Sequence, residues 1–507
     1  MTSEYHRDTV ELNPLPPPGQ GTIRPSLGSL QRIARNAVSI LTSDVLNRAT
    51  TFVMYALVAR HLGPFQFGQL SLALTLFYTF QVLAVAGLKT LIVREVAKRR
   101  DETDRYLVNG SLVVAFFSLL ALGLMALFVQ LMGYGPETRT VILLLSLGLL
   151  PYSITAICEG VFQAWERMHF IAMANVPANI VKVGMVYLLL SQGYQVRHLV
   201  ILILLTYVGI AVIEWIVMLR FITRPRLQLD LAFGAGMVRA TLTFLGIDVI
   251  IAVWASLTTL LLSRLATETE VGLFSAATQL MVPVALIFQS VVMSVFPIMC
   301  RRFDPSFTGL KQIAEQLVEL LLIIALPTAV GIYFIADSAL LLLYGDESFL
   351  EAVPVLRIVI WILVLRALTT ALGQVLLASL RERITLRIVA VNTLISFVMG
   401  LLLIGRFGLM GAAITVLLTG VVNFLQHYIP VSRLLSGISL GKLLWKPALA
   451  VGVMAGYLFL VREEGLWVNI LGAALIYATV LGGLIVWTHG GPRQLKARYS
   501  YLWSGAK

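Results

Sequence analysis

Residues 198–219, HLVILILLTYVGIAVIEWIVML, decide the fold class of this chain. This stretch holds one acidic residue, Glu214, and no lysine or arginine. A helix of about 20 apolar residues is long enough to cross the hydrocarbon core of a bilayer. Because a helix satisfies its own backbone hydrogen bonds within lipid, the stretch predicts a transmembrane helix.

Similar apolar stretches lie on both sides of this one. Together they predict fourteen spans, at residues 37–59, 69–93, 108–132, 140–163, 170–190, 198–219, 238–263, 271–298, 315–336, 352–377, 386–404, 408–431, 444–461 and 466–487. The composition agrees, because 58% of the residues are hydrophobic and 13% are charged, against roughly 25% charged in soluble domains. We therefore predict an all-α integral membrane protein.

The lysines and arginines predict its orientation, because short loops rich in them stay in the cytoplasm. With the N-terminus inside, the predicted outer segments hold at most one basic residue each: Arg60, Arg139, Arg197, Arg264, Arg406 and Arg462. Nearly all the others fall in predicted inner segments, so both termini are expected in the cytoplasm. The net charge of +12 is thus mainly a topology signal. Nucleic-acid binding would need these residues gathered on one folded surface.

An internal repeat gives a second level of organisation. Arg60, Gly68, Ser71 and Ala73 recur at a constant offset as Arg264, Gly272, Ser275 and Ala277. Both segments comprise an outer helix end, a short turn and the start of the next span. Because an even number of spans separates them, the repeats are parallel rather than inverted.

The repeat predicts two six-helix lobes around a central cavity, followed by two further helices. The predicted boundaries are a Pro-rich cytoplasmic tail at 1–36, an N-terminal lobe at 37–222, a C-terminal lobe at 238–433, helices 13 and 14 at 443–487, and a basic cytoplasmic tail at 488–507.

Charged residues inside predicted spans are candidate functional residues. Their insertion costs at least about 2.5 to 3.5 kcal/mol each, so they face a cavity or a partner. The candidates for contact with an anionic substrate are Arg48, Arg60, Lys182, Arg264, Arg357 and Arg366. Arg357 and Arg366 lie nine residues apart, on opposite helix faces, and Arg366 is the deeper of the two. Arg60 and Arg264 either form two equivalent cationic groups at the outer rim of the cavity or extend their side chains to the membrane–water interface.

Acidic residues are the candidates for binding a coupling proton or sodium ion: Asp44, Glu159, Glu214 and Asp248. Pairing with nearby cations is the alternative for each. Asp44 and Arg48 are four residues apart and share a helix face. Lys182 has no charged neighbour within one turn of its own helix, so Glu159 or Glu214 is its expected partner.

Several segments carry a resemblance to a known family. Ala59-Arg60-His61-Leu62-Gly63-Pro64, with Phe67-Gly68, Gly87-Leu88 and Val93-Arg94-Glu95, resembles the opening pattern of polysaccharide-repeat flippases of the multidrug/oligosaccharidyl-lipid/polysaccharide exporter superfamily. The likeness continues in Leu261–Leu265, Val271–Ala277 and Phe407–Ile414, and covers about residues 37–433. One departure is Thr258-Thr259, because many relatives have an aspartate in this part of span 7.

The resemblance implies a flippase for O-antigen or exopolysaccharide repeat units linked to undecaprenyl diphosphate, in a bacterial inner membrane. The implied partners are lipids, a polysaccharide polymerase and chain-length proteins. No cofactor or metal is predicted. A cation-coupled multidrug exporter of the same superfamily is the closer alternative, although its cavity would be acidic or aromatic. A membrane glycosyltransferase, polymerase or ligase is the more distant one, since the predicted outer links are short and hold no convergent catalytic set.

Overall fold

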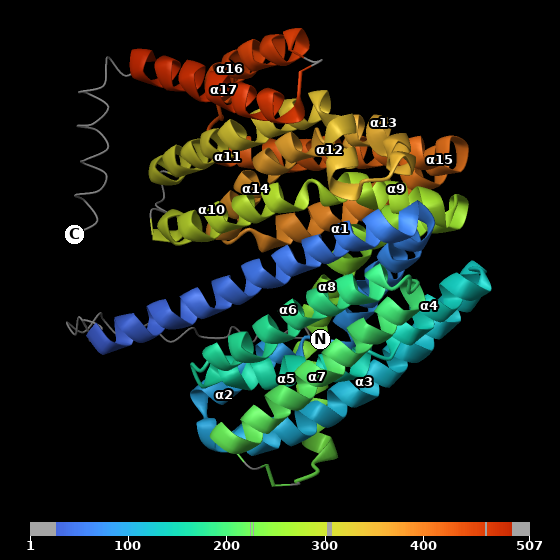
Figure 1. Ribbon diagram of the computed structural model, residues 1–507. Helices are drawn as coiled ribbons and strands as arrows, with labels where there is room; N and C mark the ends of the chain where they lie inside the picture. Colours follow the sequence, from blue (N-terminus) through green and yellow to red (C-terminus); the bar gives the residue numbers. More distant parts are fainter. Residues whose placement is uncertain (1–26, 224, 227, 302–306, 462–463, 489–507) are drawn as a thin grey trace, which may run out of the picture.

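Long helices lie side by side in two bundles in the computed structural model (Figure 1). The structure describes residues 27–223, 225–226, 228–301, 307–461 and 464–488. Within these ranges the chain forms α-helices and short 3-10 turns, without a β-strand. The predicted all-α fold is confirmed, and the protein is a multi-pass membrane protein.

The N-terminal bundle comprises α1 (Leu27–Val85), α2 (Leu88–Lys98), α3 (Thr103–Met132), α4 (Pro136–Ser146), α5 (Leu149–Ala164), α6 (His169–Ser191) and α7 (Val196–Phe221). The C-terminal bundle comprises α8 (Leu231–Leu265), α9 (Glu268–Gln279), α10 (Val282–Arg301), α11 (Thr308–Phe334), α12 (Ala336–Tyr344), α13 (Val353–Val359), α14 (Ile362–Ala378) and α15 (Glu382–Leu434). The pair α16 (Leu440–Leu460) and α17 (Leu466–Thr488) lies at the outer edge of the second bundle (Figure 1).

Eleven helices in the described part of the chain are long and apolar enough to cross a membrane. They become twelve if Glu347–Val359 and Ile362–Ala378, which are bent by 42°, form one span. α1 has 59 residues and α15 has 53, and each contains one glycine with a non-helical backbone, Gly63 and Gly408. About 20 residues cross a bilayer, so each of these two helices is long enough for two crossings. The count of fourteen stays a prediction.

The predicted span 69–93 is not one continuous helix. α1 ends at Val85 and α2 begins at Leu88, because Ala86 and Gly87 both adopt positive φ angles, of 51° and 69°. Glycine reaches this left-handed region without steric penalty. The turn gives α2 its own direction, and it packs against α5. This turn places Lys89, the second residue of α2, within the N-terminal bundle.

The two bundles meet along α1 and α9, at the end of the molecule that the charge count predicts to be outside. We call the contact formed there by Phe67, Gly68, Gly272, Tyr344 and Phe349 the outer seal. A Cβ added to Gly68 would lie 1.8 Å from the Glu268 carbonyl oxygen, and one added to Gly272 would lie 2.0 Å from the Pro64 carbonyl oxygen. The two helix backbones are therefore in direct contact, and only glycine fits at either position.

This contact is reciprocal in the way that the internal repeat predicts. Gly68 and Gly272 are equivalent residues of the repeat, and so are Pro64 and Glu268, at the same offset. Gly68 touches Glu268, and Gly272 touches Pro64. Exchanging the two repeats therefore exchanges the two contacts, as a two-fold axis does. The outer seal thus supports the predicted duplication and places its axis between α1 and α9.

Aromatic packing and hydrogen bonds close the same end. Phe67 of α1 packs against Tyr344 and Phe349, with ring centroids 6.1 and 6.0 Å apart. The Thr138 hydroxyl, on α4, donates to Glu268 Oε1 on α9 at 3.0 Å. Tyr134 and Ser263 join their hydroxyls at 2.8 Å. All these contacts link the two bundles, so the outer end is closed in this conformation.

At the opposite end, the start of α8 is fixed to the N-terminal bundle. The Asp230 carboxylate caps the helix by accepting from Phe233 N at 2.9 Å, and it also accepts from Arg105 Nη2 at 2.6 Å. The Arg105 guanidinium lies 4.1 Å from the centroid of the Phe233 ring. Met237 belongs to the same apolar cluster as Ile92 of α2. α8, which belongs to the C-terminal bundle, is therefore also attached to the N-terminal bundle.

Acid should weaken this attachment. The Phe233 amide and then the Arg105 guanidinium hold the pKa of Asp230 below its ordinary value. A carboxyl whose folded pKa is depressed stabilises the fold above its unfolded pKa of about 3.9, and this contribution is lost as the pH falls through the folded value. We expect Asp230→Asn to unfold at a lower temperature than the wild type at pH 7, with the difference vanishing in acid. Melting temperatures of the two proteins in detergent, at pH 7 and in acid, measure this difference. A difference that persists at low pH would contradict the prediction.

Candidate functional site

A pocket within the C-terminal bundle contains Arg366, in the first turns of α14. The pocket has a volume of about 190 Å³ and is lined by residues of α8, α14 and both halves of α15. Its polar lining comprises Trp254, Thr258, Arg366, Thr369, Ser396, Thr419 and Asn423. Arg366 is the one titratable residue among them. Hydroxyl and amide groups around a single guanidinium make a site suited to an anion with hydroxyl groups.

The pocket wall is held by a hydrogen-bonded amide. With the Asn392 amide oriented to satisfy both neighbours, its oxygen accepts from Trp254 Nε1 at 3.0 Å and its nitrogen donates to the Thr419 carbonyl oxygen at 3.2 Å. Asn392 is 1% exposed, so these bonds satisfy polar groups that water does not reach. They join α8 to both halves of α15 and fix the indole at the edge of the pocket.

Arg366 is exposed to this pocket and has no acidic residue within ion-pair distance among the described residues. Thr258 stands on the facing α8 wall, in the part of the chain where the resemblance places an aspartate. A carboxylate on that wall would compete for the guanidinium. With threonine there, this wall of the pocket offers no carboxylate to the guanidinium.

Arg357 lies elsewhere, as its position nine residues from Arg366 predicts. Its Nε donates to the Tyr333 carbonyl oxygen at 3.3 Å, and its guanidinium lies 5.7 Å from the centroid of the Tyr333 ring. These contacts tie α13 to α11. They give Arg357 a packing role away from the Arg366 pocket.

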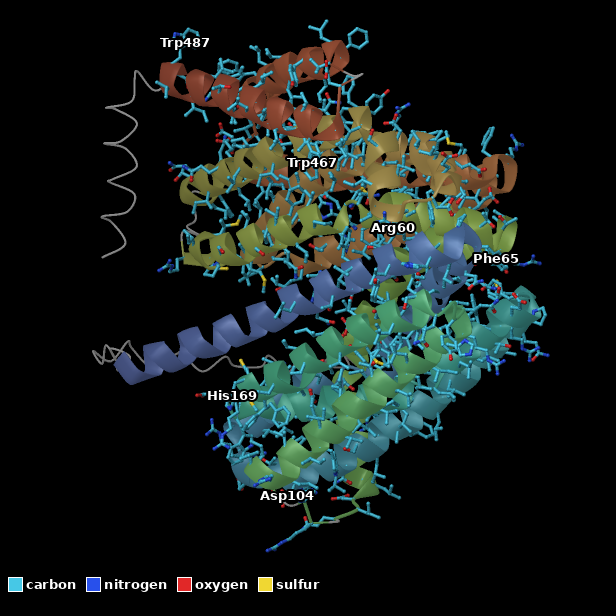
Figure 2. The ribbon with its side chains drawn as sticks, in the orientation of Figure 1. Arg60, Phe65, Asp104, His169, Trp467 and Trp487 are labelled. Carbon is cyan, nitrogen blue, oxygen red and sulfur yellow. The ribbon has the colours of Figure 1, made fainter. Side chains whose placement is uncertain are left out.

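The two outer arginines have different surroundings. Figure 2 shows Arg60 between the two bundles, with Phe65 nearby and His169 towards the other end of the N-terminal bundle. The Arg60 guanidinium lies against the backbone of Gly345, since a Cβ there would come within 2.8 Å of its Nε. Arg264 is exposed. Arg60 thus contributes to the closed outer end.

Lys182 is buried, but its expected ion pair is not formed. Its Nζ donates to Asn179 Oδ1 on the same helix at 2.6 Å, and no carboxylate of the described chain lies within ion-pair distance. Glu159 and Glu214 instead lie at the level of Asn175, two helical turns from Lys182. Two turns correspond to about 11 Å along the axis, so the predicted partners are out of reach.

Glu159 and Glu214 come together in the N-terminal bundle. The Asn175 amide nitrogen lies 3.3 Å from Glu159 Oε1 and 3.2 Å from Glu214 Oε1. Lys89 Nζ donates to Glu159 Oε2 at 2.5 Å. Four helices, α2, α5, α6 and α7, thus supply one polar cluster of four residues: Lys89, Glu159, Asn175 and Glu214. We call its two glutamates the carboxylate pair.

Of the two remaining acidic candidates, Asp248 does not join this cluster. Asp248 is exposed on α8 and forms no ion pair within the described ranges. Asp44 is helical, but its side chain lies outside the described residues, and its predicted pairing with Arg48 therefore stays a prediction. Arg48 itself is exposed on α1, which runs between the bundles (Figure 1).

Sequence reasoning missed Lys89 and Asn175. Lys89 counted as an inner-loop charge, although Gly87 was a signal that the chain turns just before it. Asn175 is uncharged and drew no attention in an apolar span. Trp254 and Asn392 were missed for the same reason. No group of three or more His, Cys, Asp or Glu residues suited to a metal ion occurs in the described part of the chain.

Comparison with known proteins gives a family match over more than half of the chain. The model of the family described as polysaccharide biosynthesis protein matches residues 33–303. The chain is also similar to a probable low-salt glycan biosynthesis flippase, Agl15, of Haloferax volcanii. The two are 20% identical over 466 residues, which cover 88% of this chain and 95% of that protein.

Two solved structures share the fold. A lipid II flippase, MurJ, in an inward closed conformation matches with a TM-score of 0.71 and 14% identity, over 88% of this chain and 98% of that one. An inward-facing MATE family multidrug transporter of the MOP superfamily matches with a TM-score of 0.64 and 15% identity, over 79% and 100%. These relatives are flippases and transporters, which confirms the prediction of a transporter rather than an enzyme. The chain belongs to the polysaccharide biosynthesis protein family and has the fold of the MOP superfamily.

Proposed function

We propose that this protein flips polyprenyl-diphosphate-linked oligosaccharide repeat units from the cytoplasmic to the outer leaflet of a bacterial cytoplasmic membrane, for surface polysaccharide assembly. The observation that carries the proposal is the Arg366 pocket, where an arginine without an acidic partner is surrounded by hydroxyl and amide groups within the membrane spans. An unpaired cation at this depth costs several kcal/mol unless a ligand or cavity compensates it.

Arginine suits a diphosphate in particular. Its planar guanidinium donates two parallel hydrogen bonds to phosphate oxygens, and it stays charged in a protein. The pocket of about 190 Å³ has room for a headgroup of this size but not for a whole oligosaccharide. Arg366 would therefore hold the diphosphate, and the sugars would extend into the central cavity that the sequence predicts.

Alternating access would move this cargo between leaflets. The outer seal closes one end of the molecule here, so opening the seal while the inner ends approach would expose the cargo to the outer leaflet. Arg48 on α1 and Lys182 on α6 belong to the opposite bundle from Arg366. We propose that they contact the anionic cargo from that side, and that Arg60 and Arg264 act at the outer end.

A cation-coupled multidrug exporter is the second candidate, and its supporting observation is the MATE-like fold. A cationic drug would be repelled by Arg366, and Thr258 supplies no negative charge in its place. The charge of the pocket therefore favours an anionic cargo. The two functions predict opposite charges on the transported molecule, and this is what the assay must separate.

Inverted membrane vesicles from cells with and without this protein provide the test. We expect the polyprenyl-diphosphate-linked oligosaccharide to accumulate on the cytoplasmic leaflet when the protein is absent, and the intact protein to restore its crossing. Leaflet distribution can be read from accessibility to a glycosidase that does not cross membranes. Normal crossing without the protein, together with protein-dependent uptake of a cationic dye, would reject the flippase in favour of the exporter.

A further inference from the structure

The carboxylate pair in the N-terminal bundle has no part in the Arg366 pocket. Glu159 and Glu214 come from neighbouring helices, α5 and α7, and share one amide donor, Asn175. Glu214 is 0% exposed. Two acidic side chains at such close range inside the bundle need an explanation, because ionised groups there are normally paired one to one with cations.

The available donors do not satisfy two ionised carboxylates. The Asn175 amide carries two hydrogens, but three acceptors lie within reach, namely the two glutamates and the Ile171 carbonyl oxygen at 3.2 Å. Lys89 reaches Glu159 alone. Glu214 Oε2 has no hydrogen-bond partner and is shielded from solvent. One ammonium and one shared amide thus face two carboxyl groups.

We propose that Glu159 and Glu214 together bind one exchangeable proton. With one proton on the pair, one negative charge remains, and Lys89 balances it, so the cluster is neutral. With both groups ionised, the cluster would carry a net negative charge, and the buried Glu214 carboxylate would have no cation bonded to it, which costs several kcal/mol. The step is a simple transfer in which a hydronium ion gives its proton to a carboxylate oxygen and leaves water behind. The proton belongs to the pair, since two interacting groups titrate together.

The other groups around Glu214 do not change this balance. On α5 its neighbours are Glu159 and the buried Cys158. On α6 they are Asn175 and, two turns away, Lys182, which is bonded to Asn179. α1 and α4 also pack against α7, and there the Tyr78 side chain of α1 is hydrogen-bonded to Tyr207, two turns from Glu214. Lys89 is thus the one described cation bonded to the pair.

The position of Lys89 gives the proton a link to movement of the bundles. One turn along α2, Ile92 lies beside Met237 of α8, with both side chains against Gly110. α8 also packs against α15 of the C-terminal bundle. A shift of α8 would therefore move α2 and its lysine. Withdrawing Lys89 would strengthen the hold of the pair on its proton, because a nearby cation favours the ionised form.

Infrared difference spectroscopy tests the proton site without any cargo. Purified protein in lipid is titrated with acid and base, and the carbonyl stretch of protonated carboxyl groups is followed. We expect a protonated band at neutral pH that Glu214→Gln removes. Glu319→Gln, which removes an intramembrane carboxylate next to Lys446, is the matched control and should leave the band in place. A neutral-pH spectrum unchanged by Glu214→Gln would overturn the proposal.

Transport measurements test the coupling role, which rests on the proposed flippase function. In proteoliposomes, a pH gradient should stimulate flipping by the wild type and by Glu319→Gln, whereas Glu214→Gln should flip at the same rate with and without the gradient. A normal melting temperature for Glu214→Gln would show that the variant folds. Stimulation that follows sodium instead of protons would overturn the proton site in favour of a cation site.

The two proposals can fail separately. If the infrared band disappears in Glu214→Gln but the wild type flips no lipid-linked oligosaccharide, the proposed function falls and the proton site stands. If the wild type flips its cargo and the Glu214→Gln spectrum is unchanged, the proton site falls and the flippase stands.

Discussion

Replacing Arg366 with alanine is expected to lower the rate of flipping roughly 10- to 150-fold, because a hydrogen bond to a charged group contributes about 1.5 to 3 kcal/mol. Arg366 is the one titratable group lining its pocket, so no neighbour can replace its charge. Arg366→Lys keeps the charge but loses the paired hydrogen bonds of the guanidinium, and an intermediate rate is expected. Proteoliposomes loaded with a polyprenyl-diphosphate-linked oligosaccharide measure both.

Arg357→Ala is the matched comparison for Arg366→Ala. It removes an arginine from the same bent segment, but one whose contacts are the Tyr333 ring and carbonyl oxygen. We expect its rate to fall by less than about threefold, since a partly exposed packing contact contributes little. If both variants were equally impaired, a general loss of positive charge or of stability would explain the result, and the assignment of the diphosphate to Arg366 would fail.

Replacing Gly68 or Gly272 with alanine is expected to prevent closure of the outer seal. A Cβ at either position would come within about 2 Å of a carbonyl oxygen on the other helix, so the helices must move apart. Overpacking of this kind costs about 1 to 3 kcal/mol, which shifts a two-state equilibrium roughly 5- to 150-fold. The variants should spend more time open at the outer end, and flipping should slow because the cycle requires closure.

Pulsed electron spin resonance between labels on α4 and α9 measures this opening directly, as a longer distance in Gly68→Ala than in the wild type. Because the contact is reciprocal, Gly272→Ala should produce the same change. Gly209→Ala on α7, where an added Cβ meets no atom within 4 Å, is the control for a glycine replaced within a helix. Unchanged distances in both seal variants would show that the contact does not limit closure.

Local sequence patterns predicted much of the fold. The apolar stretches found in the sequence form helices in the described structure, with breaks at 86–87, 147–148, 280–281 and 360–361. A long apolar segment in lipid satisfies its backbone only as a helix. The repeat of Gly68 as Gly272 was visible in the sequence, and the structure places the two in one contact. The break at Ala86 and Gly87 was missed, since the long run of hydrophobic residues around it outweighed the one signal, Gly87.

The candidate site could be predicted only in part. Arg366 was identified from its depth in a span and its helix face, both of which depend on sequence spacing alone. The ion pair of Lys182 was predicted wrongly, because helix spacing says nothing about which residues of other helices lie at the same level. Glu159 is bonded to Lys89, 70 residues away in the chain.

The sequence by itself determined that this chain is a multi-pass helical membrane protein and that charged residues lie within its spans. These properties follow from hydrophobicity and helix period, which act on neighbouring residues. Tertiary structure decided which charges are paired and which are free. It paired Glu159 with Lys89, placed Arg366 in a polar pocket, and packed Gly68 against α9. Such contacts depend on how distant helices pack, and the free energy of packing is set by shapes that meet only in the folded molecule.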